Sequence, residues 1–232
     1  MKYSLVIPCY NEAANLPQLV ERCRHLATHP DTEVILVDNG STDATPALLE
    51  KLLRDAPNCR QIRIEANQGY GFGILSGLRA AHGEVIGWTH ADLQTDPLDV
   101  LNGFQIYEKR GSNVFVKGRR YGRPLSDIVF TVGMSLFESV LLGRRLWDIN
   151  AQPTLFPRAF FMTWDRPPHD FSLDLYAYYQ ARLAGLNVHR FPVRFGERLN
   201  GTSHWNVNWA AKRKFIARTV KFSLELKKRI QS

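Results

Sequence analysis

The chain has 232 residues, which is enough for one large domain and short for two. Hydrophobic residues make up 44% and charged residues 22%, so an intrinsically disordered chain is excluded. The formal net charge is +8, and eleven Lys/Arg against two acids lie from Arg190 onward, so a near-neutral body precedes a basic C-terminal segment.

Targeting and membrane-spanning segments are not expected. The N-terminus runs directly into a strand-like segment and lacks the apolar stretch and cleavage site of a secretory signal. The longest apolar region, residues 128–143, is interrupted by Glu138, so no transmembrane helix is predicted. Cys9, Cys23 and Cys59 are an odd count at unrelated spacings, which favours reduced thiols in the cytoplasm over disulfides or a zinc site.

Short apolar runs alternate with amphipathic runs over the first hundred residues. Buried strands are predicted at residues 4–7, 34–37, 62–64 and 85–88, and helices at residues 16–27, 45–54 and 69–82. Asn15 is a candidate cap for the first helix, and Thr45 followed by Pro46 is typical of a helix start. This alternation predicts a mostly parallel sheet with right-handed crossovers.

The second half of the chain is less regular. It predicts helices at residues 125–142 and 171–184, a strand at residues 188–195 and a basic final helix at residues 205–230. With no linker or repeat, we expect a single domain over residues 1–232, in which residues 1–110 bind the ligand, residues 111–204 form a second half and residues 205–232 form the basic helix.

Three polar clusters follow the carboxyl ends of predicted strands, at residues 8–12, 38–43 and 90–96. In a parallel sheet these ends share one edge, and ligands bind there. Asp38 and Asn39 carry acceptor oxygens suited to a nucleobase or to ribose hydroxyls, but the same segment is also an ordinary turn-forming sequence. Convergence at one edge is the first indication of a functional site.

A possible metal site lies in the third cluster. His90, Asp92 and Gln94 occupy alternate positions, so their side chains point to one side of an extended segment. An imidazole, a carboxylate and an amide oxygen are ligands that Mg²⁺ or Mn²⁺ accepts, with diphosphate oxygens completing the shell. The alternative is an Asp-based turn leading into the helix after Pro97.

Other segments carry weaker signals. The glycine-rich loop at residues 67–73 departs from a dinucleotide fingerprint and follows the third strand, so it indicates close backbone approach rather than hydride transfer. The basic segments at residues 119–123 and 197–204 are either phosphate-binding loops or solvated surface. Asp170 and Asp174 lie one helical turn apart, and each is either a general base or a favourable charge at a helix N-terminus.

Together these segments resemble the family 2 glycosyltransferases with a GT-A (Rossmann-like) fold, in particular the dolichyl-phosphate mannose synthase-like branch. The resemblance runs from about residue 3 to 205 and is carried by residues 6–12, 34–43, 67–69, 91–97 and 198–204, the last similar to the family's R-x-x-G-x-S-K. It implies inverting sugar transfer from a nucleotide diphosphate sugar, with a divalent metal, onto a polyprenyl-phosphate or cell-envelope glycan acceptor.

The resemblance also assigns roles to residues. It implies a nucleotide-sugar pocket formed by Pro8, Tyr10, Glu12, Asp38, Asn39, Asn67, Gly69 and Asp92. It also implies a metal and diphosphate site formed by Asp92, Gln94 and His90, and a phosphate or acceptor site formed by Arg119, Arg198, Ser203 and His204. Asp174 would be the candidate base.

Three positions depart from the family pattern. His90 stands where the family usually has the first Asp of D-x-D, which removes one negative charge from the metal site, and Asn39 replaces the second Asp of the usual pair after strand two. Polyprenyl-phosphate branches carry an Arg and a Ser where this chain has Ile128 and Val132.

The basic C-terminal helix has two interpretations. It combines Lys and Arg with aromatic residues, so it either lies on an anionic membrane surface or packs on the domain with its charges in water. Nucleic acid is not an expected partner, because no recognised binding motif is present. We therefore expect a cytoplasmic protein, or one bound peripherally at the inner face of the cell membrane.

Two other functions are weighed against the glycosyltransferase. A nucleotidyltransferase would carry a basic, glycine-rich loop after the first strand, and residues 8–12 contain neither Gly nor Lys/Arg. A non-catalytic nucleotide-sugar or membrane-surface binding protein remains open because of His90.

Overall fold

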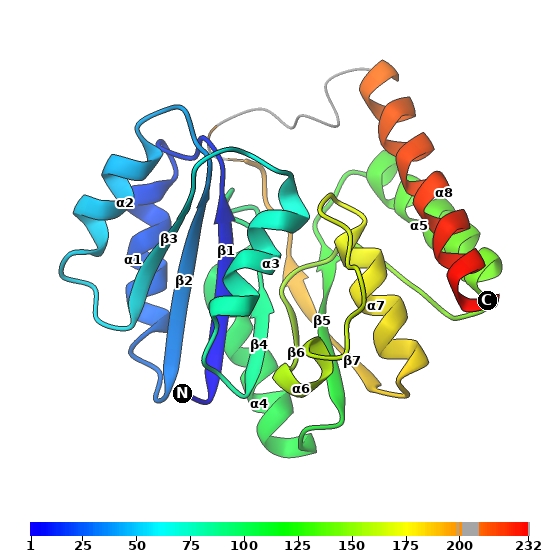
Figure 1. The fold of residues 1–232 in the computed structure, drawn as a ribbon, viewed down its shortest axis with the longest axis horizontal. Coiled ribbons are helices and arrows are strands. Elements are labelled where there is room, and N and C mark those ends of the chain that lie inside the picture. The colour runs from blue at the N-terminus through cyan, green and yellow to red at the C-terminus, as the bar shows by residue number, and fades with distance from the viewer. Residues whose placement is uncertain (199, 201–208, 232) are drawn as a thin grey trace.

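A computed structural model describes residues 1–198, 200 and 209–231 and contains one seven-stranded sheet with helices on both faces (Figure 1). The strands run in the order β3-β2-β1-β4-β6-β5-β7. Their bounds are β1 Tyr3–Cys9, β2 Thr32–Asn39, β3 Cys59–Ile64, β4 Val85–Trp88, β5 Val114–Tyr121, β6 Thr154–Pro157 and β7 Asn187–Arg194. The helices are α1 Leu16–Leu26, α2 Thr45–Leu53, α3 Tyr70–Ala80, α4 Val100–Arg110, α5 Leu125–Leu142, α6 Arg158–Phe161, α7 Leu173–Leu183 and α8 Trp209–Gln231, with a 3₁₀ turn at Pro97–Asp99.

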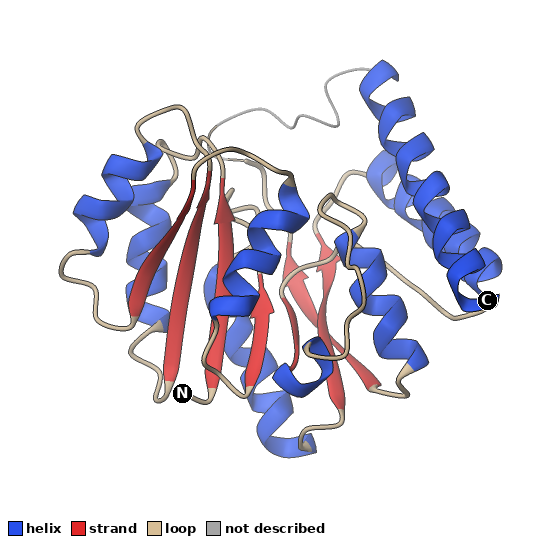
Figure 2. Ribbon diagram, viewed as in Figure 1, coloured by secondary structure: helices blue, strands red, loops and turns tan. Residues whose placement is uncertain are grey.

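The sheet is mostly parallel, as the sequence predicts. β1 pairs in parallel with β2 and β4, β2 with β3, and β5 with β7, while β6 runs antiparallel between β4 and β5. β6 is not predicted from the sequence because its four residues end in Pro157 and are too few to show a period. The result is that β1, β2 and β4 end at one edge, the upper edge in Figure 2.

Two apolar layers cover the two faces of the sheet. Side chains alternate across each strand, so Leu5 and Ile7 join the layer beneath α1 and α4, while Val6 joins the layer beneath α3 and α7. Gly77 of α3 lets that helix approach closely, because an added Cβ would lie 2.3 Å from the Val6 side chain.

Several sequence interpretations need correction. Arg119 and Arg120 belong to strand β5 and not to a loop, because the buried apolar run that starts this strand continues into a basic end that pairs with β7. Asn15 makes no side-chain capping bond; its amide donates to Glu12 instead. Thr45 is the first residue of α2, and the Asp43 carboxylate accepts its backbone N–H.

The paired helices α5 and α8 stand beside α7 at one end of the molecule (Figure 1). Helix α5 has a mean hydropathy of 1.6 and only 17% of it is buried, so by length and composition it is the one helix among the described residues that could cross a membrane. Length and composition alone do not overturn the expectation from sequence that α5 is not a transmembrane helix, and it stays a prediction. Glu138 is fully buried against α8, which explains how an acid fits in an apolar helix.

Candidate functional site

The loops after β1 and β2 are joined by hydrogen bonds at the upper edge of the sheet. The backbone N–H of Asn11 donates to Ser41 Oγ (3.0 Å), and that of Thr42 donates to Asn11 Oδ1 (2.9 Å). The backbone N–H of Glu12 donates to Thr45 Oγ1 (2.9 Å). Two of the predicted polar clusters therefore form one continuous rim.

Asp38 lies at the floor of this rim with an unsatisfied oxygen. Its side chain is 1% exposed, and Oδ1 accepts the backbone N–H of Ser41 (3.0 Å). Oδ2 has no hydrogen-bond partner, since the exposed Arg63 Nε is 3.9 Å away, beyond hydrogen-bond distance. A buried carboxylate oxygen without a donor is rare, and it suits a ligand N–H or O–H.

Asn39, Asn67 and Gly69 are also brought together, but two of their side chains serve the loop. Asn39 Nδ2 donates to the carbonyl of Gly69 (2.9 Å), and Asn67 Oδ1 accepts the Gly69 backbone N–H (2.8 Å). Gly69 has a φ of 108°, and a Cβ there would lie 2.4 Å from the carbonyl of His169. Only a glycine fits this close approach.

The third cluster is held by the segment that follows β7. Arg198 Nη2 lies 2.8 Å from Asp92 Oδ2, and Asp92 is 6% exposed. Two hydrogen bonds join Gln94 to Gly196. The backbone N–H of Gly196 donates to the Gln94 carbonyl (2.7 Å), and the Gln94 side-chain amide donates to the Gly196 carbonyl (3.2 Å). Residues about one hundred positions apart thus form one wall of the site.

Glu12 completes an acidic pair around Arg198. Burial raises the pKa of Glu12 above its usual value, and a hydrogen bond from Asn15 opposes this rise. The charge of Asp92 raises the pKa of Glu12 further, while the charge of Arg198 lowers it. All three predicted clusters therefore meet at one edge, with an arginine among their carboxylates.

The predicted metal ligands are not arranged as a ready-made metal site. The His90 ring stacks on Tyr70 with 5.5 Å between centroids, Gln94 bonds to Gly196, and Asp92 is paired with Arg198. Within the described residues, no three His, Cys, Asp or Glu side chains lie close enough to hold a metal ion. The donor set of this structure thus does not fit a resident ion without rearrangement of Arg198.

A stack of three rings separates this edge from a buried polar layer. Tyr70 lies between His90 and Phe171, 4.4 Å from the latter. Burial and the neighbouring charge of Asp174 raise the pKa of the Tyr70 hydroxyl well above its usual value. Sequence reasoning missed this stack, because Tyr70 belongs to a glycine-rich loop and Phe171 lies a hundred residues away.

Asp174 lies below the stack, where its side chain is 2% exposed. Its Oδ1 accepts a hydrogen bond from Gln152 (2.5 Å) and lies 3.7 Å from Lys117 Nζ. Lys117 is fully buried and donates to Thr154 Oγ1 (2.9 Å); burial lowers its pKa to about 8, against the attraction of Asp174. The carboxylate is thus part of a buried ion pair, and its role as a base stays a prediction.

The basic segment around Arg119 divides into two parts. Arg119 is exposed near the end of β5. Three other arginines surround the buried Asp148, namely Arg120, Arg123 and Arg190. Burial of Asp148 raises the pKa of its carboxyl, but Arg120 outweighs this effect and the pKa lies below its usual value. Ser203 and His204 lie outside the described residues, so the structure does not place them.

The nucleotide-sugar residues at the rim vary in accessibility. Tyr10 is 39% exposed, Glu12 and Pro8 are partly buried, and Asp38 is fully buried. A ligand held by Asp38 would therefore lie in the rim with Tyr10 beside it.

The model of the family described as Glycosyl transferase family 2 matches residues 4–161. This chain belongs to that family. An undecaprenyl-phosphate 4-deoxy-4-formamido-L-arabinose transferase of Pseudomonas fluorescens is 38% identical over 177 residues, covering 68% of this chain and 51% of the relative. A dodecaprenyl-phosphate galacturonate synthase of Rhizobium johnstonii is 33% identical over 123 residues, covering 52% of this chain and 36% of the relative. The chain thus spans about half the length, or less, of these curated relatives.

Solved structures share the fold. Glucosyl-3-phosphoglycerate synthase from Mycobacterium tuberculosis, solved with Mn²⁺, UDP and glucosyl-3-phosphoglycerate, has a TM-score of 0.71 at 16% identity, covering 97% of this chain and 79% of that one. A mannosyltransferase from Pyrobaculum calidifontis in complex with GDP-Man and Mn²⁺ has a TM-score of 0.70 at 18% identity, covering 100% and 64%. The GT-A fold expected from the sequence is confirmed. The dolichyl-phosphate mannose synthase-like branch is not specifically supported.

Proposed function

We propose that this family 2 glycosyltransferase transfers a sugar, with inversion, from a nucleotide diphosphate sugar to a polyprenyl-phosphate or another cell-envelope glycan acceptor. The observation that carries the proposal is the unsatisfied Oδ2 of buried Asp38 on the same edge as Asp92 and Arg198. Two relatives are named for sugar transfer to undecaprenyl and dodecaprenyl phosphate, which supports the acceptor class.

The nucleoside end of the donor would lie at β1 and β2. Asp38 Oδ2 would accept an N–H of the base or a hydroxyl of the ribose, and the half-exposed Tyr10 ring would pack on the base. Pro8 and Glu12 would form the wall between them. Asn39, Asn67 and Gly69 would act through the shape of their loop.

The diphosphate end of the donor would lie at Arg198. A guanidinium is suited to bidentate phosphate recognition, and Arg119 is exposed for the same purpose. A divalent ion is supported in general by neighbours solved with Mn²⁺, and Asp92, His90 and Gln94 would hold it only after Arg198 is displaced from Asp92. An ion bound there would offset the charge of the leaving diphosphate.

The transfer step is a direct displacement at the anomeric carbon. An acceptor oxygen forms the new bond while the bond to the diphosphate breaks, and the diphosphate leaves as an anion. A phosphate acceptor is already deprotonated and needs no base, whereas a hydroxyl acceptor needs one. Asp174 is the proposed base for a hydroxyl, and it would have to be uncovered from beneath Tyr70 and Phe171.

A non-catalytic nucleotide-sugar binding protein is the second candidate. The pairing of Asp92 with Arg198 favours it, because the carboxylate expected at a metal is already neutralised. Both functions would bind the donor at the rim that contains Asp38, and they differ in turnover.

Binding and turnover can be measured separately. We expect at least one of a panel of UDP and GDP sugars to raise the melting temperature, with slow donor hydrolysis detected by release of the nucleoside diphosphate. Asp38→Asn should weaken donor binding about tenfold or more, since a side-chain amide can present an N–H where the ligand donor belongs. The matched control is Glu50→Gln, which changes an exposed acid on α2.

The results of these measurements distinguish the glycosyltransferase from the binding protein. Stabilisation without release by the wild type supports the binding protein. An unchanged affinity of Asp38→Asn for the donor would contradict the proposal, and so would the absence of stabilisation by any nucleotide sugar.

Peripheral attachment at the inner face of the membrane is also proposed. From sequence, the basic C-terminal segment over residues 205–232 either lies on an anionic membrane or packs on the domain, and the structure describes α8 within it. Arg213, Lys221, Lys227 and Lys228 of this helix are exposed, which supports contact with anionic lipid.

A further inference from the structure

Helix α5 turns its apolar side outward. Leu125, Val129, Val132, Leu136 and Val140 recur at intervals of four, three, four and four residues, so they form one stripe along the helix. Their exposed fractions run from 36% to 76%, with Leu125 at 75% and Val140 at 76%. We call these five residues the α5 stripe. It covers the full helix, which is roughly 27 Å long at 1.5 Å per residue.

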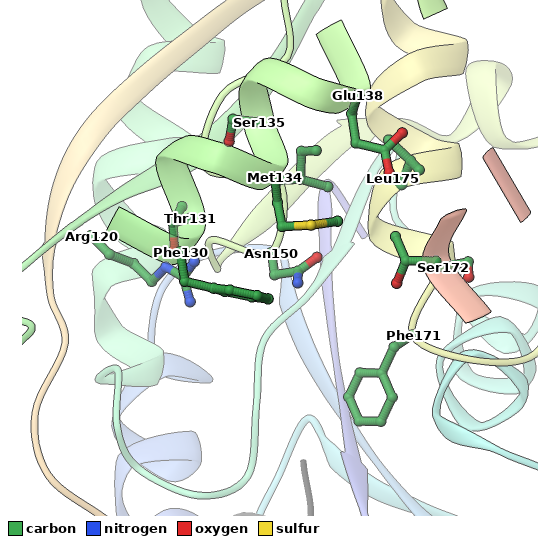
Figure 3. Close-up of a pocket in the computed structure, with 12 residues that line it drawn as sticks. Arg120, Phe130, Thr131, Met134, Ser135, Glu138, Asn150, Phe171, Ser172 and Leu175 are labelled. Carbon is green, nitrogen blue, oxygen red and sulfur yellow. The ribbon is translucent and has the colours of Figure 1, made fainter. Parts of the chain in front are cut away.

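The opposite side of α5 faces the protein, and it buries the polar Ser135 and Glu138 beside the partly buried Phe130 and Met134. Thr131, Ser135 and Glu138 line a cavity of about 50 Å³ between α5, α7 and α8 (Figure 3). Ser135 Oγ accepts the backbone N–H of Asp148 (3.0 Å), and Glu138 Oε1 is bonded to Ser223 of α8 (2.8 Å). This pattern is the reverse of a helix on a water-soluble domain, so the α5 stripe requires an apolar environment outside the chain.

The described side chains of helix α8 offer little apolar surface for such a contact. Its Phe222 and Leu226 pack inward on the core, and Leu226 is 2% exposed. Among the described large apolar side chains of α8, only Leu224 is substantially exposed, at 46%. The exposed part of α8 is chiefly cationic.

Positive charge lies next to the α5 stripe. Arg144 and Arg145 are exposed directly after the last turn of α5, and Lys221, Lys227 and Lys228 are exposed on the paired helix α8. The accessible acids on these two helices are Asp127 and Glu225. Apolar side chains flanked by cations match the acyl boundary and the headgroups of an anionic bilayer.

We propose that the α5 stripe is a lipid-bilayer contact surface that lies in the interface of an anionic membrane, with the α8 cations on the headgroups. A spanning orientation does not fit, because the inner side of α5 is held to the rest of the chain by the bonds of Ser135 to Asp148 and of Glu138 to Ser223 of α8. This deepens the membrane part of the proposed function and rests on it, but it does not require sugar transfer.

The experiment uses the full chain with a fluorescent label on one cysteine. Cys9, Cys23 and Cys59 are buried, so a new surface cysteine reacts selectively. An environment-sensitive dye is placed at Leu136→Cys in the stripe and, as the control, at Met162→Cys, which is 72% exposed on α6's carboxyl end. Phosphatidylcholine vesicles with and without phosphatidylglycerol are then added.

We expect a blue shift at position 136 and none at position 162, with partition at least about tenfold stronger onto anionic vesicles. The triple variant Val129→Asp, Leu136→Asp, Val140→Asp should lose vesicle binding altogether. The triple variant Lys221→Gln, Lys227→Gln, Lys228→Gln should lose the preference for phosphatidylglycerol and its sensitivity to salt.

Three results would overturn the proposal. One is no spectral shift at position 136. The second is wild-type partition in the triple Asp variant. The third is a wild-type dimer that the Asp variant converts to a monomer while neither binds lipid, since a second copy would then cover the stripe. The labelled Leu136→Cys chain answers the question even if the triple variant does not fold. Nucleotide-sugar stabilisation measured without vesicles shows separately whether the proposed function has failed.

Discussion

The buried pair Lys117 and Asp174 is the most unusual feature at the scale of single residues. Neither side chain is more than 2% exposed, and both belong to the layer beneath the Tyr70 stack. A buried ion pair contributes little net stability when intact, but removal of one partner leaves the other charge buried without a counter-charge or water. The pair therefore links β5 to α7 inside the core.

Lys117→Met tests this layer. We expect it to lower the free energy of unfolding by about 3 to 5 kcal/mol, because Asp174 would then keep only the amide of Gln152. Urea unfolding at neutral pH measures the change. Lys117→Met combined with Asp174→Leu should recover much of the loss, and a double variant less stable than the single one would contradict the ion-pair account.

At the residue scale, the sequence predicted the edge but not the layer below. Asp38 and Asp92 lie in polar clusters after strands, so their shared edge followed from strand order. Lys117 was missed, because strand β5 was not predicted and only its pairing with β6 and β7 buries a lysine that is ordinarily exposed.

Helix α5 shows the same division at the scale of elements. Its bounds, Leu125–Leu142, were predicted correctly from its continuous apolar character. Which side faces the protein was not predictable, because apolar residues occur around most of the helix. The contact with α8 decides it by burying Ser135 and Glu138.

Glu138→Gln tests the contact between α5 and α8. Burial raises the pKa of Glu138 to about 7 from 4.5, and Oε2 has no hydrogen-bond partner. The unfolded chain therefore releases this proton at lower pH than the folded chain, so wild-type stability falls as pH rises from about 4.5 to 7. The shift corresponds to about 3 kcal/mol, and the glutamine variant should lack this part of the decline.

Urea unfolding of both proteins at pH 5 and pH 8 gives the measurement. The difference between the two proteins is the relevant quantity, because Asp99, whose pKa burial raises to about 6, also contributes in both. Parallel pH dependences in the wild type and Glu138→Gln would show that this carboxyl is ionised throughout.

At the scale of the whole molecule, Arg198 joins the segment after β7 to loops of the first half of the chain. The segment after β7 returns to the end of β4, where Arg198 lies with Asp92 and Glu12. The candidate site is therefore complete only when the outer part of the sheet has formed.

Arg198→Leu removes the cation between these acids. Repulsion from Asp92 should then raise the pKa of Glu12 further, so the variant should lose stability relative to wild type as pH rises from 4 to 8, by about 1 kcal/mol. The control is Arg63→Leu, since the Arg63 side chain is 67% exposed and 3.9 Å from Asp38. Equal losses in both variants at pH 8 would mean that Arg198 is only a surface charge.

The sequence by itself determined the parallel sheet, the edge at which polar loops gather and the family to which the chain belongs, since each depends on local order and spacing. Tertiary structure alone decided that Lys117 is buried, that Arg198 reaches Asp92 and that α5 faces outward. These depend on contacts between segments far apart in the chain, and hydrophobic periodicity contains no information on which distant segment covers a given face.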